Sequence, residues 1–237
     1  MIFVTGDTHG EPYRLKLQMK TKMVLSNNPR EFNKNDYLII TGDFGCIWSV
    51  SPDGDKEKLD FLTNLPWTTL FVDGNHENFD RLDKFEKVEM FGDRVQKIQD
   101  SIYRLQRGKV YIIDGKKFFT MGGGYSLDKA QRREFISWWS QELPTTKEMD
   151  DGLDELEKHH NVVDYIITHS APMKISNSLI AMKQLYHKDA SQENGLRNYF
   201  QHIYDTVRYG HWYCGHFHED CRIGNVHFLY ESMERII

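Results

Sequence analysis

The sequence has no long hydrophobic run and few cysteines and prolines, and each shortage excludes a class of protein. No segment approaches the roughly 18 consecutive apolar residues that a membrane-spanning helix needs. The three cysteines, Cys46, Cys214 and Cys221, are odd in number and lack Cys-x-x-Cys spacing, which argues against a disulfide framework or a thiolate zinc site. The six prolines are scattered, and no repeat or linker divides the chain. We therefore expect a single domain over residues 1–237.

The composition is typical of a soluble globular enzyme. Of the 237 residues, 39% are hydrophobic and 27% are charged, and a net charge of −5 gives no general reason to bind a polyanion. Strand-like residues begin at Met1, which leaves no room for a secretory signal, so we expect a cytoplasmic protein without a membrane partner. A basic stretch between Arg14 and Lys34 is read as a solvated surface in preference to a nucleic-acid site.

Short apolar runs alternate with amphipathic segments along the chain. The runs, which are typical of strands buried on both faces, are 2–4, 37–40, 69–72, 165–167 and 211–213. Four helices are predicted between them. The first is marked by Leu15, Met19 and Met23, the second by Phe79, Leu82 and Phe85, the third by a Thr145/Glu148 capping box, and the fourth by Ser191 as its cap, with Leu196, Phe200 and Ile203.

Two hairpins are predicted in addition. Asp114-Gly115 separates the runs 110–113 and 118–120, and this dipeptide tolerates the positive φ angles of a type I′ turn. A second hairpin is expected around 226–230. Alternating strands and helices with added hairpins predict a layered α/β fold with a mixed sheet.

Polar side chains follow each of the five apolar runs. Ligands of open α/β sheets gather beyond the carboxyl ends of the strands. The residues that follow the runs, in chain order, are Asp7 and His9, Asp43, Asn75 with His76, His169, and His216 with His218.

The types and spacing of these residues favour a metal centre. Side chains at i and i+2 of an extended segment point the same way, so Asp7 and His9 converge, and so do His216 and His218. Oxygen and imidazole donors without thiolate suit Mn²⁺ first, with Fe, Zn²⁺, Co²⁺ or Ni²⁺ as alternatives. Seven donors are enough for two divalent ions if one carboxylate bridges them, and Asp43 is the natural bridge because it comes alone from its strand.

These motifs resemble, in type and order, those of the calcineurin-like metallophosphoesterase superfamily. The resemblance runs from Asp7 to His218 and so covers nearly the whole chain. It implies a layered β-sandwich of mixed sheets flanked by helices, with His76 as proton donor. It also implies one metal held by Asp7, His9, Asp43 and His218, and a second held by Asp43, Asn75, His169 and His216.

The implied activity is hydrolysis of a phosphomonoester or phosphodiester. Two cations neutralise phosphate oxygens and acidify a water molecule, so we predict in-line attack by a hydroxide that bridges the metals. Asp43 and Asn75 hold the catalytic metals, and His76 protonates the leaving group. A hydrogen bond from His76 without proton transfer is the alternative for that residue.

Three basic residues after a glycine-rich turn are candidates for substrate binding. Gly122–Gly124 leads to Lys129, Arg132 and Arg133, whose charges suit a small phosphorylated substrate. Phosphoprotein phosphatases carry an Asp-Arg pair after the second motif, whereas this chain has Phe44-Gly45-Cys46-Ile47-Trp48 there. The chain therefore resembles a general prokaryotic or phage enzyme rather than that branch.

Two other functions remain open. The first is a metal-bearing interaction module without turnover, although such proteins usually lose a ligand or the proton donor. The second is a nuclease, for which nucleic-acid binding is possible but not favoured. The substrate and the oligomeric state do not follow from the residues.

Overall fold

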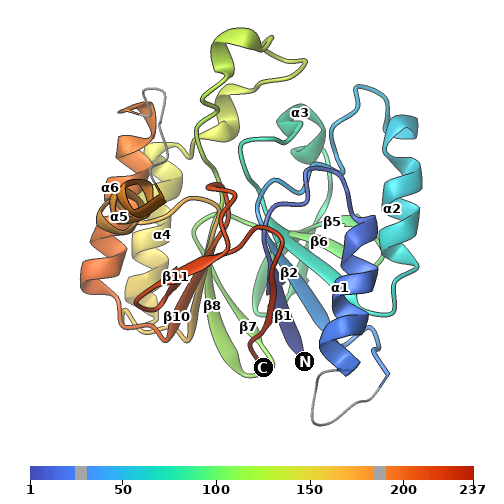
Figure 1. Ribbon diagram of the computed structural model, residues 1–237, viewed down its shortest axis with the longest axis horizontal. Coiled ribbons are helices and arrows are strands. Elements are labelled where there is room, and N and C mark those ends of the chain that lie inside the picture. Colours follow the sequence, from blue (N-terminus) through green and yellow to red (C-terminus); the bar gives the residue numbers. More distant parts are fainter. Residues whose placement is uncertain (25–30, 184–190) are drawn as a thin grey trace.

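A computed structural model describes residues 1–24, 31–183 and 191–237, with the side chains of residues 22–24 left out. Two mixed β-sheets face each other and helices cover their outer faces (Figure 1). The first sheet has the order β13-β1-β2-β3-β6-β5-β4. Its strands are β1 (Ile2–Thr5), β2 (Tyr37–Thr41), β3 (Thr68–Val72), β4 (Lys87–Met90), β5 (Asp93–Gln99), β6 (Ile102–Leu105) and β13 (Met233–Arg235).

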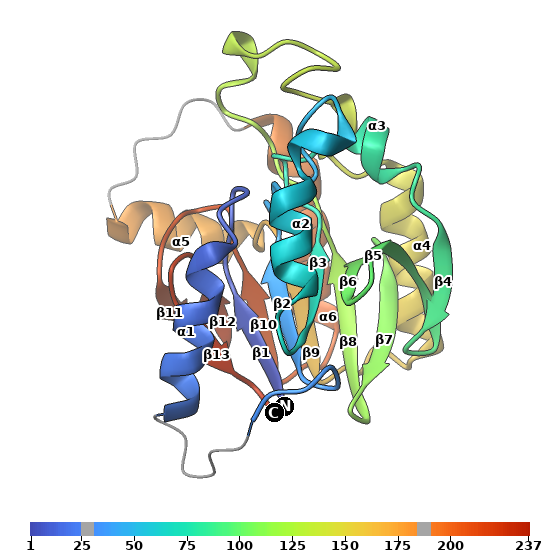
Figure 2. The ribbon, with the colours of Figure 1, turned by 90° about the vertical axis from the view of Figure 1, so that its right-hand side faces the viewer.

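The second sheet has the order β11-β12-β10-β9-β8-β7. Its strands are β7 (Lys109–Ile113), β8 (Lys116–Met121), β9 (Tyr165–Thr168), β10 (His211–Cys214), β11 (Cys221–Ile223) and β12 (Val226–Phe228). Strands β1, β2 and β3 run parallel in the first sheet, as do β8, β9 and β10 in the second. The carboxyl ends of five strands lie toward one end of the molecule, opposite the two chain termini (Figure 2). These are the strands that precede the polar motifs: β1, β2, β3, β9 and β10.

Helices lie on both sides of the paired sheets. Helices α1 (Tyr13–Val24) and α2 (Lys56–Thr63) cover the outer face of the first sheet, as Figure 2 shows. The short α3 (Phe79–Leu82) follows β3. The helices α4 (Thr146–Lys158), α5 (Met173–Lys183) and α6 (Asn194–Thr206) cover the second sheet. This is the α/β sandwich of mixed sheets that the sequence predicts.

Alternation along the strands divides the apolar core into layers. In β1, Ile2 and Val4 point into the cluster between the sheets, whereas Phe3 points to the cluster under α1 and α2. In β10, Tyr213 points inward and Trp212 packs under the helices of the second sheet. Both faces of these central strands are therefore buried, which explains why they read as continuous apolar runs in the sequence.

Most of the predicted elements are confirmed, but two helix predictions are wrong in detail. Thr145 and Glu148 form the complete capping box at the start of α4. Helix α6 begins at Asn194 after a 3₁₀ turn (η4, Ser191–Glu193), so Ser191 is not its cap; the backbone is already helical at Glu193. Helix α3 ends at Leu82, and Phe85 packs from the segment that follows it.

In the first helix, Leu15 and Met19 are buried as expected, while the Met23 side chain lies outside the described residues.

The first predicted hairpin is present, and the second is present over 221–228 instead of around 226–230. Asp114 (φ 49°) and Gly115 (φ 73°) both have the positive φ of a type I′ turn between β7 and β8. The second hairpin joins β11 to β12, and β12 also pairs in parallel with β10. The sequence did not predict β4, β5 and β6, which extend the first sheet; β4 lies at the sheet edge with half its residues exposed, so its apolar signal is weak.

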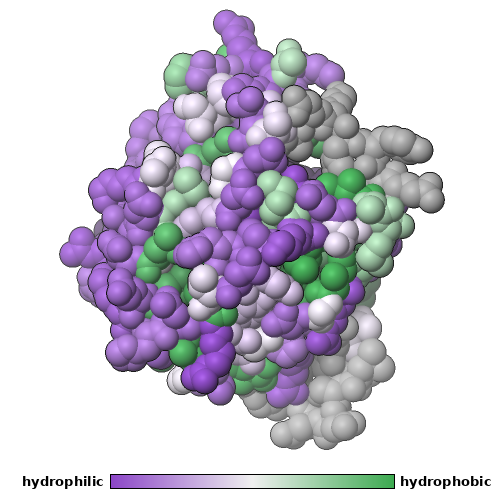
Figure 3. Space-filling model, turned by 90° about the vertical axis from the view of Figure 1, so that its left-hand side faces the viewer, coloured by the Kyte–Doolittle hydropathy of each residue, from purple (hydrophilic) through white to green (hydrophobic). Residues whose placement is uncertain are grey.

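The outer surface over α4, α5 and α6 is mainly hydrophilic, with small separate hydrophobic areas (Figure 3). No helix in the described ranges combines the length and apolar character needed to cross a bilayer.

Two residues of the basic stretch between Arg14 and Lys34 bind backbone carbonyl groups. Arg14 donates to the carbonyl oxygens of Asp7 and Tyr230, and Lys34 donates to three further carbonyls. These two charges hold chain segments together. Arg30, in the same stretch, lies outside the described residues.

Candidate metal centre

Loops from both sheets bring the predicted polar residues together at the carboxyl ends of the strands. Asp7, Asp43 and Asn75 follow β1, β2 and β3, and His169 and His216 follow β9 and β10. The two sheets thus supply opposite sides of one site. Asp7 shows this directly, because both oxygens of its side chain accept the backbone N–H of His216, from the other sheet, at 3.2 and 3.1 Å.

Unusual backbone geometry is concentrated in these loops. Four of the donor residues have left-handed φ angles, which non-glycine residues rarely adopt: His9 (46°), Asp43 (45°), His216 (68°) and His218 (52°). Such strain persists only where the surroundings enforce it, and it clusters at functional sites. Glycine is also needed where the backbone passes close to the two carboxylates. A Cβ on Gly74 would lie 2.0 Å from Asp43 Oδ1, and one on Gly215 would lie 1.9 Å from Asp7 Oδ1.

Asp7, His9, Asp43 and His218 form the first group of donors. One ligand atom from each of the four lies within 4.8 Å of all the others. Metal–ligand bonds of about 2.0–2.2 Å place donors of one ion within about 4.4 Å of one another, so small shifts suffice to bind an ion. The Nε2 atoms of His9 and His218 are 2.9 Å apart, and His218 Nε2 is 3.3 Å from Asp7 Oδ2.

The amide oxygen of Asn75 is the centre of a second group. It lies 3.0 Å from His169 Nε2 and 3.0 Å from His216 Nδ1. His169 Nε2 is also 3.3 Å from Asp43 Oδ1, so Asp43 contacts both groups. The second predicted donor set is therefore brought together around Asn75, with Asp43 between the two sets.

Three residues that the sequence analysis did not identify set which atoms face the site. His169 Nδ1 lies 2.9 Å from the carbonyl oxygen of Thr41, which can only accept, so Nδ1 carries the hydrogen and Nε2 presents its lone pair. Ser126 accepts from Asn75 Nδ2 at 3.1 Å, which turns the amide oxygen toward the histidines. The buried Glu193 lies 3.3 Å from His216 Nε2 and directs His216 Nδ1 to Asn75.

A divalent cation fits this arrangement of donors. In the second group, the lone pair of His169 Nε2 faces the oxygens of Asn75 and Asp43. Acceptors that face each other at about 3 Å need a shared positive centre. Asp7 and Asp43 are both 1% exposed, and in the described part of the chain their ion-pair partners within 4.0 Å are histidines only.

Burial and mutual charge change the protonation of the site. Burial raises the pKa of Asp43, but His169, His76 and His9 outweigh it and lower that pKa to about 2. Burial lowers the pKa of His9, and it lowers that of His76 to about 4. Ionised carboxylate and neutral imidazole are the forms that bind metals.

His216 differs from the other histidines in its protonation. Burial lowers its pKa, but the Glu193 carboxylate more than offsets this and raises it to about 9. A cation at His216 Nδ1 must therefore displace a proton, so binding there is expected to strengthen as the pH rises.

Glu77, which follows His76, is fully buried and supports the loop of the second motif. Its carboxylate accepts the backbone N–H groups of Phe44 at 2.7 Å and Gly45 at 3.2 Å. Burial, with the nearby charge of Asp43, raises the pKa of Glu77 well above its usual value. The sequence gives no sign of this role beyond the position of Glu77 after His76.

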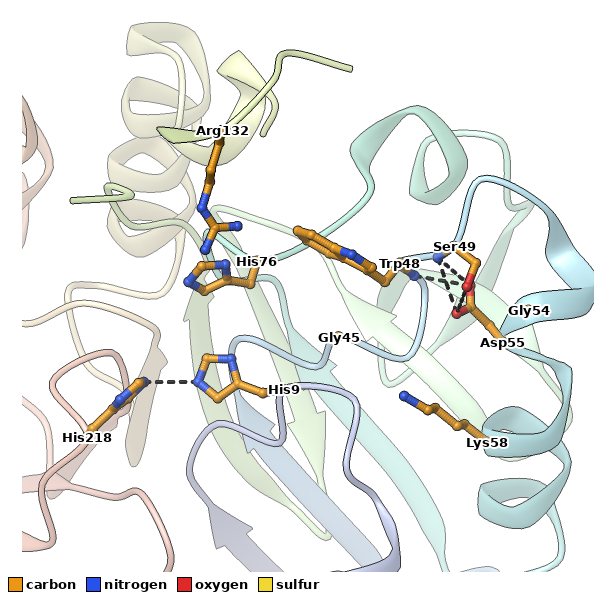
Figure 4. Close-up of a pocket in the computed structure, with 10 residues that line it drawn as sticks. All are labelled: His9, Gly45, Trp48, Ser49, Gly54, Asp55, Lys58, His76, Arg132 and His218. Atoms are coloured by element: carbon orange, nitrogen blue, oxygen red, sulfur yellow. Dashed lines mark hydrogen bonds between the residues drawn. The ribbon is translucent and has the colours of Figure 1, made fainter. Parts of the chain in front are cut away.

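A cavity of about 480 Å³ opens in front of the donors (Figure 4). His9, His76 and His218 line one end, and Arg132 lies above His76. Among the predicted substrate residues, only Arg132 lines this cavity, and it is held by Asp128 at 2.7 Å and by the carbonyl oxygen of Ser137.

The other candidate substrate residues lie elsewhere. The Lys129 ammonium lies 3.8 Å from the ring centroid of Trp138 and lines a separate cavity with Tyr125. Arg133 is exposed and is not among the residues that line the cavity in front of the donors. Trp139, the neighbour of Trp138, is 1% exposed and belongs to the core.

The glycine-rich turn lies against the second donor group. A Cβ on Gly124 would be 3.0–3.1 Å from atoms of His169, Asn75 and His216. The absence of a side chain therefore allows this backbone to pack directly over the donors.

The comparison with protein families agrees with the geometry. The family model for calcineurin-like phosphoesterases matches residues 1–220. The chain therefore belongs to this family and is a metal-dependent hydrolase that acts on phosphate esters. A comparison with curated proteins gave no significant match.

Proposed function

We propose that the chain binds two divalent cations bridged by Asp43 and hydrolyses small phosphate monoesters or diesters. The observation that carries this proposal is the meeting of Asp7, His9, Asp43 and His218, whose ligand atoms lie within 4.8 Å of one another. The second donor group around Asn75 supports a second cation. Oxygen and imidazole donors favour Mn²⁺, with Fe, Zn²⁺, Co²⁺ and Ni²⁺ as the other candidates.

The residues of the chain divide the work between holding cations and handling protons. When bound, the cations neutralise phosphate oxygens and acidify a water molecule. Asp7, His9 and His218 hold one side of the site, and His169 with Asn75 holds the other. The buried, ionised Asp43 lies between them. The backbone N–H of His76 holds it there by donating to Asp43 Oδ1 at 2.8 Å.

His76 is proposed to donate the proton to the leaving oxygen. Its ring lines the cavity, and its Nε2 lies 3.9 Å from Asp43 Oδ2. With a pKa of about 4 it is neutral at neutral pH, so the role requires a bound phosphate anion to raise that pKa. Arg132, which lowers the pKa of His76, is placed to bind the same phosphate.

A reducing, cytosolic location is also proposed. Cys46 and Cys214 are buried free thiols, and burial raises the pKa of both, which makes them poor nucleophiles. They therefore have no evident redox role.

An activity panel tests the proposed function. The protein is freed of metal, reloaded with Mn²⁺, Zn²⁺, Fe²⁺, Co²⁺, Ni²⁺ or Mg²⁺, and assayed on mononucleotides, cyclic nucleotides, dinucleotides, phosphopeptides and aryl esters. Metal content is measured in parallel. We expect two ions per chain and metal-dependent turnover. Stable binding of metal with no turnover on any substrate would favour the interaction module.

The proton-donor role has its own test. Replacing His76 with Ala should leave metal content intact and lower kcat by roughly 10²- to 10⁴-fold on a substrate with a poor leaving group. The loss should shrink for a nitrophenyl ester, whose leaving group needs no proton. Equal losses on both substrates would remove the proton-donor role.

A further inference from the structure

The cavity in front of the metal centre has a second end, away from the donor histidines. Ser49, Gly54, Asp55 and Lys58 line it, and Trp48 lies between the two ends (Figure 4). The proposed reaction needs only the first end. At about 480 Å³ the cavity is large enough for a small-molecule ligand that reaches from one end to the other.

Lys58 is the notable charge at the far end. It is half-buried on α2 and points into the cavity, and its Nζ would lie 3.0 Å from a Cβ on Gly10. Across residues 1–24, 31–183 and 191–237, its ammonium has no hydrogen bond or ion pair. Lys56, on the same helix, by contrast pairs with Asp60.

The carboxylate in this part of the cavity is already neutralised. Asp55 pairs with Arg81 and accepts hydrogen bonds from the backbone N–H of Trp48 at 3.1 Å and the hydroxyl of Ser49 at 2.8 Å. These contacts leave the positive charge of Lys58 uncompensated. They also fix the loop that carries Trp48.

Trp48 connects the far end to the reacting end. Its half-buried ring packs edge-on against Trp139 at 5.7 Å between centroids and lies 6.3 Å from the His76 ring. If His76 protonates the leaving oxygen, the leaving group lies on the His76 side and therefore next to Trp48. A planar group there can pack against the indole ring.

We propose that the preferred substrates are phosphate esters whose leaving group is a planar ring that carries a second anionic group. The ring packs against Trp48 and the anion pairs with Lys58. This inference rests on the proposed function, because it places the scissile phosphate at the metal centre. It adds a specificity-determining residue that none of the metal-binding motifs contains.

Matched substrates test the role of Lys58. Phenyl phosphate and 4-carboxyphenyl phosphate differ by one carboxylate on the leaving group. The ratio of their kcat/KM values is measured for the wild-type protein and for Lys58→Met, Lys58→Arg and the control Lys56→Met. Comparing this ratio between variants cancels the intrinsic difference between the two leaving groups.

We expect Lys58→Met to lower the ratio about tenfold, the usual size for one charge-assisted contact. Lys58→Arg should restore most of it, and Lys56→Met should leave it unchanged. The preference should also weaken at high salt. A ratio that is the same in the wild-type protein and in Lys58→Met would overturn the inference, and so would an equal fall in Lys56→Met.

A binding measurement separates this inference from the proposed function. Phenylphosphonate and 4-carboxyphenylphosphonate are not hydrolysed, so their binding can be measured by calorimetry. Lys58→Met should have a higher Kd than the wild-type protein for the carboxylated ligand alone. If the protein hydrolyses no ester but this selective loss is seen, the proposed function fails and the anion subsite stands. If the esters are hydrolysed but both ligands bind Lys58→Met as they bind wild type, the subsite fails alone.

Discussion

Asp43 and Asp73 follow neighbouring parallel strands and are both almost fully buried, yet their surroundings differ. Each oxygen of Asp73 is bound by one guanidinium, Oδ1 by Arg104 at 2.8 and 3.0 Å and Oδ2 by Arg107 at 2.6 and 2.8 Å. The Asp43 carboxylate has histidine rings around it and accepts the backbone N–H of His76.

The two sites lower the carboxyl pKa by different means. Burial raises the pKa of Asp73, and the permanent charges of Arg104 and Arg107 outweigh it. For Asp43 the opposing charge comes from imidazoles, which can lose their protons. Two arginines give a carboxylate permanent partners and make its role structural. Histidines around a carboxylate can give up their protons, and the group as a whole can then bind a cation.

The largest expected effect is a loss of activity on replacing Asp43, in contrast to the loss of stability expected on replacing Asp73. Replacing Asp43 with Asn should lower kcat/KM by roughly 10³-fold or more, because both proposed ions lose a ligand. Metal content should fall while the fold survives, which metal analysis and circular dichroism can check. Asp53→Asn, an exposed control, should change neither. Full activity in Asp43→Asn would refute the bridging role.

Replacing Asp73 with Asn should act mainly on stability. It removes the carboxylate that both buried guanidiniums share and leaves Asp83 and Glu148 as their more distant acidic partners. The expected loss is about 3–5 kcal/mol in the free energy of unfolding. Denaturant titration measures it, with Asp83→Asn as control because Asp83 contacts Arg104 from the exposed side at 3.5 Å. If Asp73→Asn were as stable as the control, the contrast between the two carboxylates would fail.

Removing the charge of Glu193 should weaken metal binding without abolishing it. Glu193→Gln keeps an acceptor for His216 Nε2 but lowers the basicity of the ring, so affinity for the second ion should fall about 10- to 100-fold. Competition with a metal-sensitive dye measures the two affinities separately. Glu157→Gln, on an exposed part of α4, should have no effect. If Glu193→Gln lost only the ion held by Asp7, His9, Asp43 and His218, Glu193 would not act on the second ion and the prediction would be wrong.

The smallest expected effect concerns acid stability. Because the folded-state pKa of Asp73 lies below the ordinary value of 3.8, its stabilising contribution is complete above that pH. It is lost as the pH falls through the folded-state pKa. Metal-free wild-type protein should therefore lose stability steeply below about pH 4, and Asp73→Asn less steeply. Parallel curves for the two proteins would mean that Asp73 is not ionised in the fold.

How far the sequence predicted the site depended on how local each feature was. The candidate donors from Asp7 to His218 were predicted because each lies within four residues of the end of a short buried strand, in a spacing that the sequence shows directly. Glu193 and Ser126 were missed, because each acts through contacts with residues distant in the chain. With 35 acidic residues in the chain, nothing local distinguishes Glu193 from the others.

The substrate residues show the same limit. Lys129, Arg132 and Arg133 are neighbours in sequence, but only Arg132 lines the cavity beside His76. Lys129 lies over Trp138, because the ammonium is attracted to the face of the indole ring. Nothing in the sequence distinguishes Lys58 from the other lysines and arginines, of which there are 30 in all.

The sequence alone determined the five central strands, the Asp-Gly turn and the polar motifs of the candidate metal centre. These depend on hydrophobic period, turn chemistry and nearest neighbours, which act over a few residues. Only the tertiary structure decided which nitrogen of His169 and His216 faces the site, which arginine reaches the cavity and which lysine lines it. Those features depend on distances between segments far apart in the chain, and packing of the two sheets sets these distances.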